Sequence, residues 1–264
     1  MTTTEAPVPV RSPLPQGLAG QTAVIVGGSS GIGLATGALL ASVGARVVLT
    51  GRDKARLDAA AEHVRAAGGD GAVLVVAGDA ADEQALAETF ERAGAVDHVL
   101  LTAGGLGGTG PLTDITRDTA LQAMDGRLWA ALAVARAAAP RLGAGGSITF
   151  SSGAFVSRPV AGMSAPLAAV GGVETLARAL AVELAPRRLR VNALRFGQFD
   201  TPLSRGAMGA GPGEAGDAAV AQAGARNPLG RWGTPEEAAA AALFLMANPY
   251  MTGEILTIDG GLTL

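Results

Sequence analysis

The chain has 264 residues, 48% of them hydrophobic, a net charge of −3 and no cysteine. This length and composition suit one globular α/β domain and argue against general disorder. Without cysteine, disulfides and thiolate metal ligands are excluded, and with two histidines in all we expect no metal site. There is no basic cluster and no apolar run of membrane-spanning length, so we expect neither a nucleic-acid partner nor a membrane partner.

Residues 1–17 are rich in proline and lack an apolar signal core, so we interpret them as a flexible arm on a cytoplasmic protein. From residue 18 to 264, short apolar segments alternate with helix-like segments. This alternation predicts a single Rossmann-type α/β domain, a doubly wound parallel sheet of about seven strands with helices on both faces. The strands are expected at 22–28, 46–51, 72–78, 97–105, 146–152, 189–197 and 254–261.

Three later segments carry separate expectations. One long helix is expected over about 117–139. A second, over 166–185, is apolar on more than one face, which predicts a homo-oligomer, either a dimer or a tetramer. Residues 205–219 are rich in glycine, so we expect a mobile substrate loop that acts as a lid.

A glycine-rich turn, GGSSGIG at 27–33, connects the first predicted strand to the first helix. Glycines permit a tight turn and the close approach of a pyrophosphate, which the unpaired N–H groups of a helix N-terminus attract. The second strand is followed by Arg52 instead of ending in an acidic residue, and an arginine can pair with a 2′-phosphate. NADP(H) is therefore the predicted cofactor. The residues expected to bind it here are Gly27, Ser29, Ser30, Gly31, Ile32, Gly33 and Arg52.

With several further motifs, this turn resembles the short-chain dehydrogenase/reductase (SDR) family over nearly all of the chain after residue 17. The resemblance implies that Asp79 holds the adenine amino group and that the backbone at Ala103 and Gly104 lines the cofactor. It also implies that Thr201 touches the nicotinamide carboxamide. The motifs are GD at 78–79, AGG at 103–105, GGSITFSSG at 145–153, LAVELAPRRLRVNAL at 180–194, DTPL at 200–203, PLGRWGTPEEAA at 228–239 and TGEILTIDGG at 252–261.

The catalytic residues that the resemblance implies are Asn, Ser, Tyr and Lys, and of these the serine is present, as Ser152. Counting back from LARALAVELAP places the tyrosine at Pro166 and the lysine at Val170. A slip of one residue gives two alanines instead, at 165 and 169. The asparagine falls on Arg127. The family's acid and its lysine are therefore missing from the expected positions.

This loss changes the chemistry that the site can perform. Reduction of a carbonyl needs a proton for the nascent alkoxide, which neither proline nor valine can deliver. Ser152 has a hydroxyl that can bind a substrate oxygen, and Arg127, which stays protonated, would stabilise an oxyanion or clamp a carboxylate. These two are the catalytic candidates. We also expect Arg158 and Arg195 at the edge of the site and Asp200 as its nearest carboxylate.

Three functions stay open. The turn and Arg52 favour an NADP(H)-dependent oxidoreductase with a non-standard site, acting on a small activated carbonyl, imine or enone. The retained serine and added arginines favour a non-redox enzyme, such as a cyclase, dehydratase or isomerase. The loss of titratable groups favours an NADP(H)-binding pseudoenzyme or scaffold subunit. Each would take a small molecule as substrate or ligand.

Overall fold

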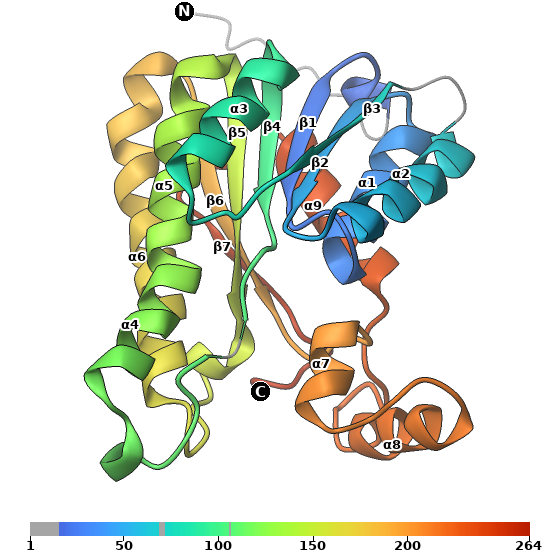
Figure 1. The fold of residues 1–264 in the computed structure, drawn as a ribbon, viewed down its shortest axis with the longest axis vertical. Coiled ribbons are helices and arrows are strands. Elements are labelled where there is room, and N and C mark those ends of the chain that lie inside the picture. Colours follow the sequence, from blue (N-terminus) through green and yellow to red (C-terminus); the bar gives the residue numbers. More distant parts are fainter. Residues whose placement is uncertain (1–15, 69–71, 106) are drawn as a thin grey trace, which may run out of the picture.

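Seven parallel strands form one sheet in the order β3-β2-β1-β4-β5-β6-β7 (Figure 1). The computed structural model describes residues 16–68, 72–105 and 107–264, so most of the predicted N-terminal arm lies outside the described residues. The central strands are covered on both faces, which explains why they read as continuous apolar runs. The strands are β1 (Thr22–Val26), β2 (Arg46–Gly51), β3 (Val73–Ala77), β4 (Val96–Leu101), β5 (Leu142–Gly153), β6 (Arg190–Phe196) and β7 (Ile255–Ile258).

Helices pack on both faces of the sheet through two hydrophobic clusters, which confirms the predicted fold class (Figure 1). None of the described helices is both long and apolar enough to span a membrane. Short 3-10 turns lie at 16–18, 112–114, 139–141, 154–156 and 185–187. One face carries α1 (Gly31–Ser42), α2 (Lys54–Gly68) and α9 (Pro235–Ala247), and the other carries α3 (Glu83–Ala93), α5 (Ala130–Ala138) and α6 (Ser164–Leu184).

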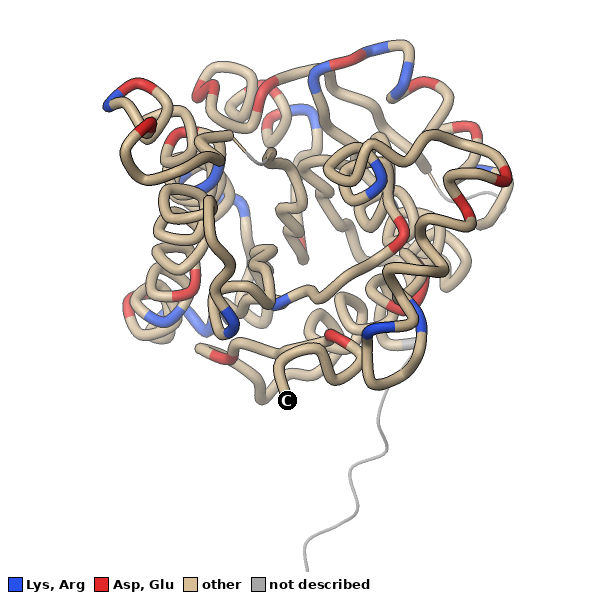
Figure 2. The backbone as a smooth tube through the Cα atoms, turned by 90° about the horizontal axis from the view of Figure 1, so that it is seen from below, with Lys and Arg blue, Asp and Glu red and all other residues tan. Residues whose placement is uncertain are grey.

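The strand order reverses between β1 and β4, and this reversal fixes where a ligand can bind. From β1 the chain proceeds outward through β2 and β3, then crosses back to β4 on the other side of β1. The connections that leave β1 and β4 therefore diverge and open a crevice at the carboxyl ends of these strands. Acidic and basic residues are interspersed along the backbone seen from this end (Figure 2).

The helix predicted over 117–139 is interrupted. It consists of α4 (Arg117–Met124), a π-helical turn at Asp125–Trp129, and α5. Such turns insert one extra residue into the helical repeat and change which side chains face the sheet. The interruption falls on the segment that contains Arg127.

The prediction of a loop over 205–219 is wrong for most of its length, because α7 (Pro202–Ala207) and α8 (Glu214–Gly224) cover all but 208–213. Thr201 caps α7 by accepting a hydrogen bond from the Ser204 N–H. Arg205 bonds both Asp200 and Asp217, which ties α7 to α8. That this segment moves as a lid stays a prediction.

A buried polar contact holds β4 against β5. His98 is 3% exposed, and its Nδ1 and Nε2 lie 2.8 Å from Ser147 Oγ and 2.7 Å from Gln21 Oε1. Burial, and next the positive charge of Arg190, lower the pKa of His98 to about 4, although Asp97 partly opposes them. The imidazole is therefore neutral in the folded protein at neutral pH.

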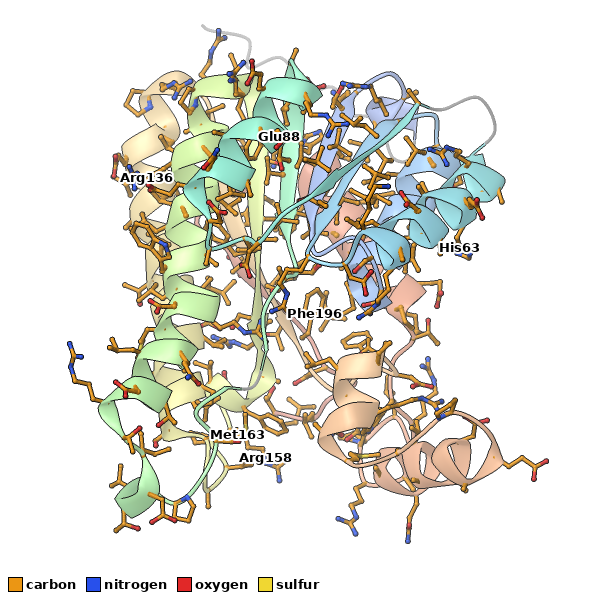
Figure 3. All side chains as sticks on the ribbon, in the orientation of Figure 1. His63, Glu88, Arg136, Arg158, Met163 and Phe196 are labelled. Atoms are coloured by element: carbon orange, nitrogen blue, oxygen red, sulfur yellow. The ribbon has the colours of Figure 1, made fainter. Side chains whose placement is uncertain are left out.

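This burial predicts a specific acid sensitivity. The unfolded chain protonates His98 near its ordinary pKa of 6.5, whereas the folded chain resists protonation down to a pKa of about 4. Stability is thus fully present above pH 6.5 and falls by about 3 kcal/mol as the pH drops toward 4. His98→Gln should flatten this dependence in urea unfolding curves. His63→Gln, at an exposed histidine on α2 (Figure 3), should leave it unchanged, and equal curves for all three proteins would contradict the account.

Candidate active site

The turn after β1 passes so close to β4 that it accepts only glycine at key positions. A Cβ added at Gly27 would lie 2.4 Å from the Ala103 nitrogen, and one at Gly33 would lie 2.2 Å from the Gly27 oxygen. Gly31 has a φ of 52°, in the left-handed region. The turn therefore brings the start of α1 directly above the carboxyl ends of β1 and β4.

The start of α1 has the donors that an anion needs. The N-cap residue Ser30 makes no side-chain capping bond. The first helical bond runs from Leu34 N to Ser30 O, so the N–H groups at positions 31–33 precede the helical ladder. Unpaired N–H groups and the positive end of the helix dipole fit a pyrophosphate.

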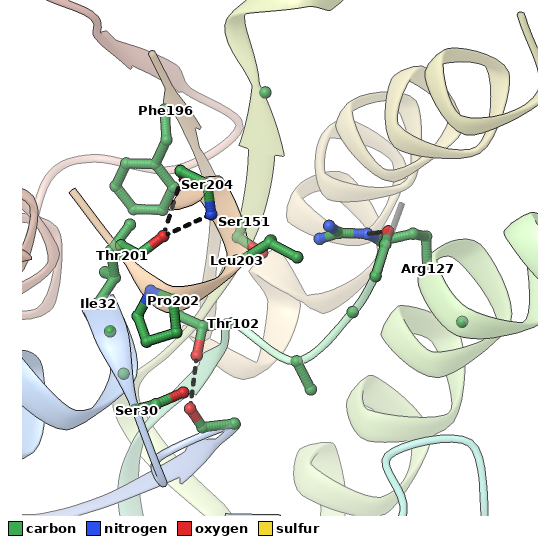
Figure 4. A pocket seen from close by; sticks show the side chains of 18 of the residues that line it. Ser30, Ile32, Thr102, Arg127, Ser151, Phe196, Thr201, Pro202, Leu203 and Ser204 are labelled. Carbon is green, nitrogen blue, oxygen red and sulfur yellow. Dashed lines mark hydrogen bonds between the residues drawn. The ribbon is translucent and has the colours of Figure 1, made fainter. Parts of the chain in front are cut away.

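One cavity of about 850 Å³ extends from this turn along the carboxyl edge of the sheet (Figure 4). At one end lie Arg52, Arg56 and Asp79, and at the other Arg127 and Ser152. Every residue that the sequence predicts to bind the cofactor lines it, and so do both catalytic candidates; that they bind NADP(H) stays a prediction. The lining residues from that set are Gly27, Ser29, Ser30, Gly31, Ile32, Gly33, Arg52, Asp79, Ala103, Gly104 and Thr201.

Arg127 extends from the π-helical turn into this cavity (Figure 4). Its Nε donates to the Gly105 oxygen at 3.1 Å, and its side chain packs against Gly104, where an added Cβ would lie 2.6 Å from the guanidinium carbon. Its two terminal nitrogens have no hydrogen-bond or ion-pair partner in the part of the chain that the structure describes. Burial lowers the pKa of Arg127, but a guanidinium remains protonated. A fixed positive charge whose terminal N–H groups can still donate hydrogen bonds therefore faces the cavity.

Ser152 is joined to a carboxylate that the sequence analysis missed. Its Oγ donates to Glu174 Oε1 at 2.5 Å, and Glu174 is 6% exposed. Arg195 holds the same carboxylate from β6, with Nε 2.8 Å from Oε1 and Nη2 2.6 Å from Oε2. The three residues come from β5, α6 and β6 and form a buried network beside the cavity.

A signal for this network was present in the sequence. Glu174 lies one helical turn after Val170, and it is an acid on a helix face that otherwise carries Val173 and Ala177 into the core. A buried acid needs a partner, which here is Arg195. The pairing is not readable from sequence, because the two residues are 21 positions apart and on different elements.

Two expectations about the edge of the site are wrong, those for Arg195 and Asp200. Arg195 is bound to Glu174 and does not line the cavity. Arg158 is not itself a lining residue, but it donates to the oxygen of Leu262, which lines the cavity. Asp200 is not the nearest carboxylate, because Asp79 and Asp125 line the cavity. Asp200 is clamped by Arg205 at 2.5 and 2.8 Å and lines a separate, smaller pocket.

The comparisons with known proteins agree with this geometry. A family model described as enoyl-(acyl carrier protein) reductase matches residues 26–263. A relative from Stachybotrys chlorohalonatus, the short-chain dehydrogenase/reductase ATR9, is 34% identical over 92% of this chain and 96% of its own length. The chain belongs to the short-chain dehydrogenase/reductase family.

Two solved SDR-like structures share the whole architecture. A reductase/Diels–Alderase, MalC, from Malbranchea aurantiaca superposes with a TM-score of 0.86 at 28% identity, covering 96% of this chain and 99% of the other. A short-chain oxidoreductase from Pseudomonas aeruginosa PAO1, described as containing an atypical catalytic center, superposes with a TM-score of 0.83 at 31% identity. It covers 92% of this chain and 97% of the other.

The positions where the SDR resemblance places tyrosine and lysine do not reach the cavity here. Pro166 and Val170 are buried in α6, and neither lines it. The chain's one tyrosine, Tyr250, is 97% exposed, and its one lysine, Lys54, is paired with Asp58 at 2.7 Å. The lining among the described residues contains no tyrosine or lysine.

The close packing at the turn gives a prediction about Gly33. Gly33→Ala places a Cβ against the Gly27 oxygen, so it should lower the free energy of unfolding by about 1–3 kcal/mol through overpacking and weaken nucleotide binding. Gly126→Ala is the matched control, because nothing lies within 4 Å of its added Cβ. Urea unfolding curves give the free energy of unfolding of both variants. A Gly33→Ala protein as stable as the control would contradict the tight turn.

Proposed function

We propose that this SDR-family chain is an NADP(H)-dependent oxidoreductase that reduces a small activated carbonyl, imine or enone without the family's tyrosine and lysine. One observation carries the proposal: a single cavity connects the glycine turn at the start of α1 with Arg127 and Ser152. A nucleotide held at the turn would therefore reach toward a fixed positive charge. That arrangement supports a reaction in which negative charge develops on the substrate.

The choice of NADP(H) over NAD(H) rests on charge at the end of β2. Arg52 and Arg56 line the cavity there, and Ser29 lies beside Gly51, within 3.4 Å of its added Cβ. A 2′-phosphate would meet two guanidinium groups, and charge-assisted bonds of this kind are the strong ones. An acidic residue at this place, which would bind a free ribose hydroxyl and repel a phosphate, is not present.

The mechanism follows from what Arg127 can and cannot do. When bound, the cofactor would supply a hydride to the substrate carbon. Negative charge would then develop on the substrate oxygen, and the Arg127 guanidinium, oriented by its bond to the Gly105 oxygen, would stabilise it. Because a guanidinium does not release a proton, the proton comes from water or is already present on the substrate. Activated substrates lose least from the missing acid, which in other enzymes contributes about 10²–10⁴-fold.

The neighbouring structures support the idea that this architecture works with unusual sites. The Pseudomonas aeruginosa oxidoreductase is described as having an atypical catalytic center. The Malbranchea aurantiaca protein is described as a reductase and a Diels–Alderase, which also favours a second candidate here, a non-redox reaction in the same cavity. Consumption of NADPH by the full-length chain distinguishes the two.

A homo-oligomer is part of the proposal. Val182 on α6 is 77% exposed, and Leu121 and Trp129 on the same side of the sheet are 40% and 36% exposed. Apolar side chains exposed along packed helices fit a contact with a second copy of the chain.

The first test concerns Arg52. Arg52→Ala should weaken NADPH binding about tenfold or more and leave NADH binding almost unchanged, because the lost bond is to the 2′-phosphate. Fluorescence titration with each nucleotide measures this. Lys54→Ala is the matched control, since Lys54 is exposed, two residues away and outside the cavity lining. If Arg52→Ala lowered the affinity for NADPH and for NADH by the same factor, the 2′-phosphate contact would be refuted.

The second test concerns Arg127. Arg127→Met keeps an unbranched, flexible side chain but removes the charge, so turnover of an activated acceptor should fall about 10²-fold while NADPH affinity stays similar. NADPH oxidation followed against quinones, enones and cyclic imines measures the rate. Arg136→Met removes a charge from the outer surface of α5 and should change the rate little (Figure 3). Full activity in Arg127→Met would contradict the mechanism.

A further inference from the structure

The Ser152 hydroxyl already donates its single proton in a hydrogen bond. Its Oγ lies 2.5 Å from Glu174 Oε1, well within hydrogen-bond distance. Both carboxylate oxygens of Glu174 also accept N–H groups of Arg195. Arg195 is in turn held by Thr257 Oγ1 at 3.5 Å. On the side away from Ser152, the oxygens of Glu174 therefore already accept hydrogen bonds from Arg195.

The chemistry of these groups fixes the direction of the serine bond. A guanidinium has donors and no acceptor, so each bond from Arg195 requires Glu174 to accept. A carboxylate engaged in this way has no proton of its own, so Ser152 must be the donor. Burial would raise the pKa of Glu174, but the hydrogen bonds from Arg195 and Ser152 outweigh it and hold the pKa below its ordinary value.

The bond between Ser152 and Glu174 is buried, so its direction persists. The side chains of Arg195 and Glu174 are 19% and 7% exposed, and Ser152 is 7% exposed. A hydroxyl has one proton and two lone pairs, so Ser152 retains only acceptor capacity toward the cavity that it lines. This differs from the expectation from sequence that Ser152 would donate to a substrate oxygen.

We propose that Ser152 presents an acceptor oxygen to the substrate, that Glu174 acts as the positioning residue that keeps it so, and that the substrate donates an N–H or O–H there. The proposal rests on the proposed function and names its substrate class. Arg127 contributes only hydrogen-bond donors to the same cavity, whereas Ser152 contributes an acceptor. The substrate class they select is a small molecule that carries a carbonyl oxygen together with an N–H or O–H, in preference to a plain ketone.

The first experiment locates the proton without any ligand. Protein with ¹³C-labelled serine is recorded by NMR in an equal mixture of H₂O and D₂O, where a slowly exchanging hydroxyl splits its Cβ signal into two. Ser152, assigned by the signal lost in Ser152→Ala, should split. The splitting should vanish in the double variant Glu174→Met, Arg195→Met, which replaces the ion pair by two unbranched apolar side chains. An unsplit Ser152 signal in the wild-type protein would overturn the positioning role.

The second experiment asks which ligands the site accepts. Pyrrolidin-2-one has a carbonyl and an N–H, whereas N-methylpyrrolidin-2-one has the carbonyl alone. Ligand-observed NMR should give about three- to tenfold tighter binding of the N–H lactam, the size of one hydrogen bond. The preference should persist in Ser152→Thr and disappear in Ser152→Ala, which separates hydrogen bonding from the bulk of the methyl group.

Two outcomes would overturn the acceptor role. One is equal affinity for the two lactams, including no detectable binding of either. The other is a preference that survives in Ser152→Ala, which would assign it to steric exclusion. Neither experiment needs hydride transfer, so the acceptor role can fail while NADPH oxidation persists, and the proposed reductase activity can fail while the lactam preference persists.

Discussion

The parallel direction of all seven strands is the constraint on which the site depends. Because every strand ends at the same edge of the sheet, residues far apart in sequence are delivered to one cavity. Gly27 after β1, Arg52 after β2 and Ser152 near the end of β5 meet there for this reason. The close approach of β1 to β4 at Gly27 then places the start of α1 over the junction, where its N–H groups face the cavity.

The region that in the SDR resemblance holds tyrosine and lysine is built differently in this chain. Pro166 and Val170 are buried in α6. One helical turn after Val170, Glu174 joins Ser152 and Arg195 in a hydrogen-bonded network. Breaking a buried ion pair by removing one partner leaves an uncompensated charge, which is strongly destabilising. The network therefore restricts which single substitutions this part of the site tolerates. Arg127 is the cation at the Ser152 end of the cavity, whereas Arg52 and Arg56 lie at its other end.

The sheet and the phosphate turn could be predicted from the sequence because their signals are local. An apolar strand followed directly by GGSSGIG indicates a strand, a tight turn and the start of a helix within one short segment. Such a turn needs glycine, so the motif can be interpreted without knowing any distant contact. The Ser152–Glu174 bond could not be predicted, since it depends on how α6 rotates against β5, and periodicity places Glu174 on the helix without giving its partner. The helix at Pro202–Ala207 was missed for another reason: the glycines after it dominated the interpretation, although Thr201 and Pro202 are an N-cap and a first-turn residue.

The proposed chemistry requires that the cavity at the carboxyl edge of the sheet holds a nicotinamide dinucleotide. Isothermal titration calorimetry of the full chain with NADPH, and separately with NADH, tests that claim most directly. The account predicts saturable binding of NADPH, and weaker binding of NADH because Arg52 and Arg56 lie at the adenosine end of the cavity. An absence of binding heat for both nucleotides at several temperatures would contradict it.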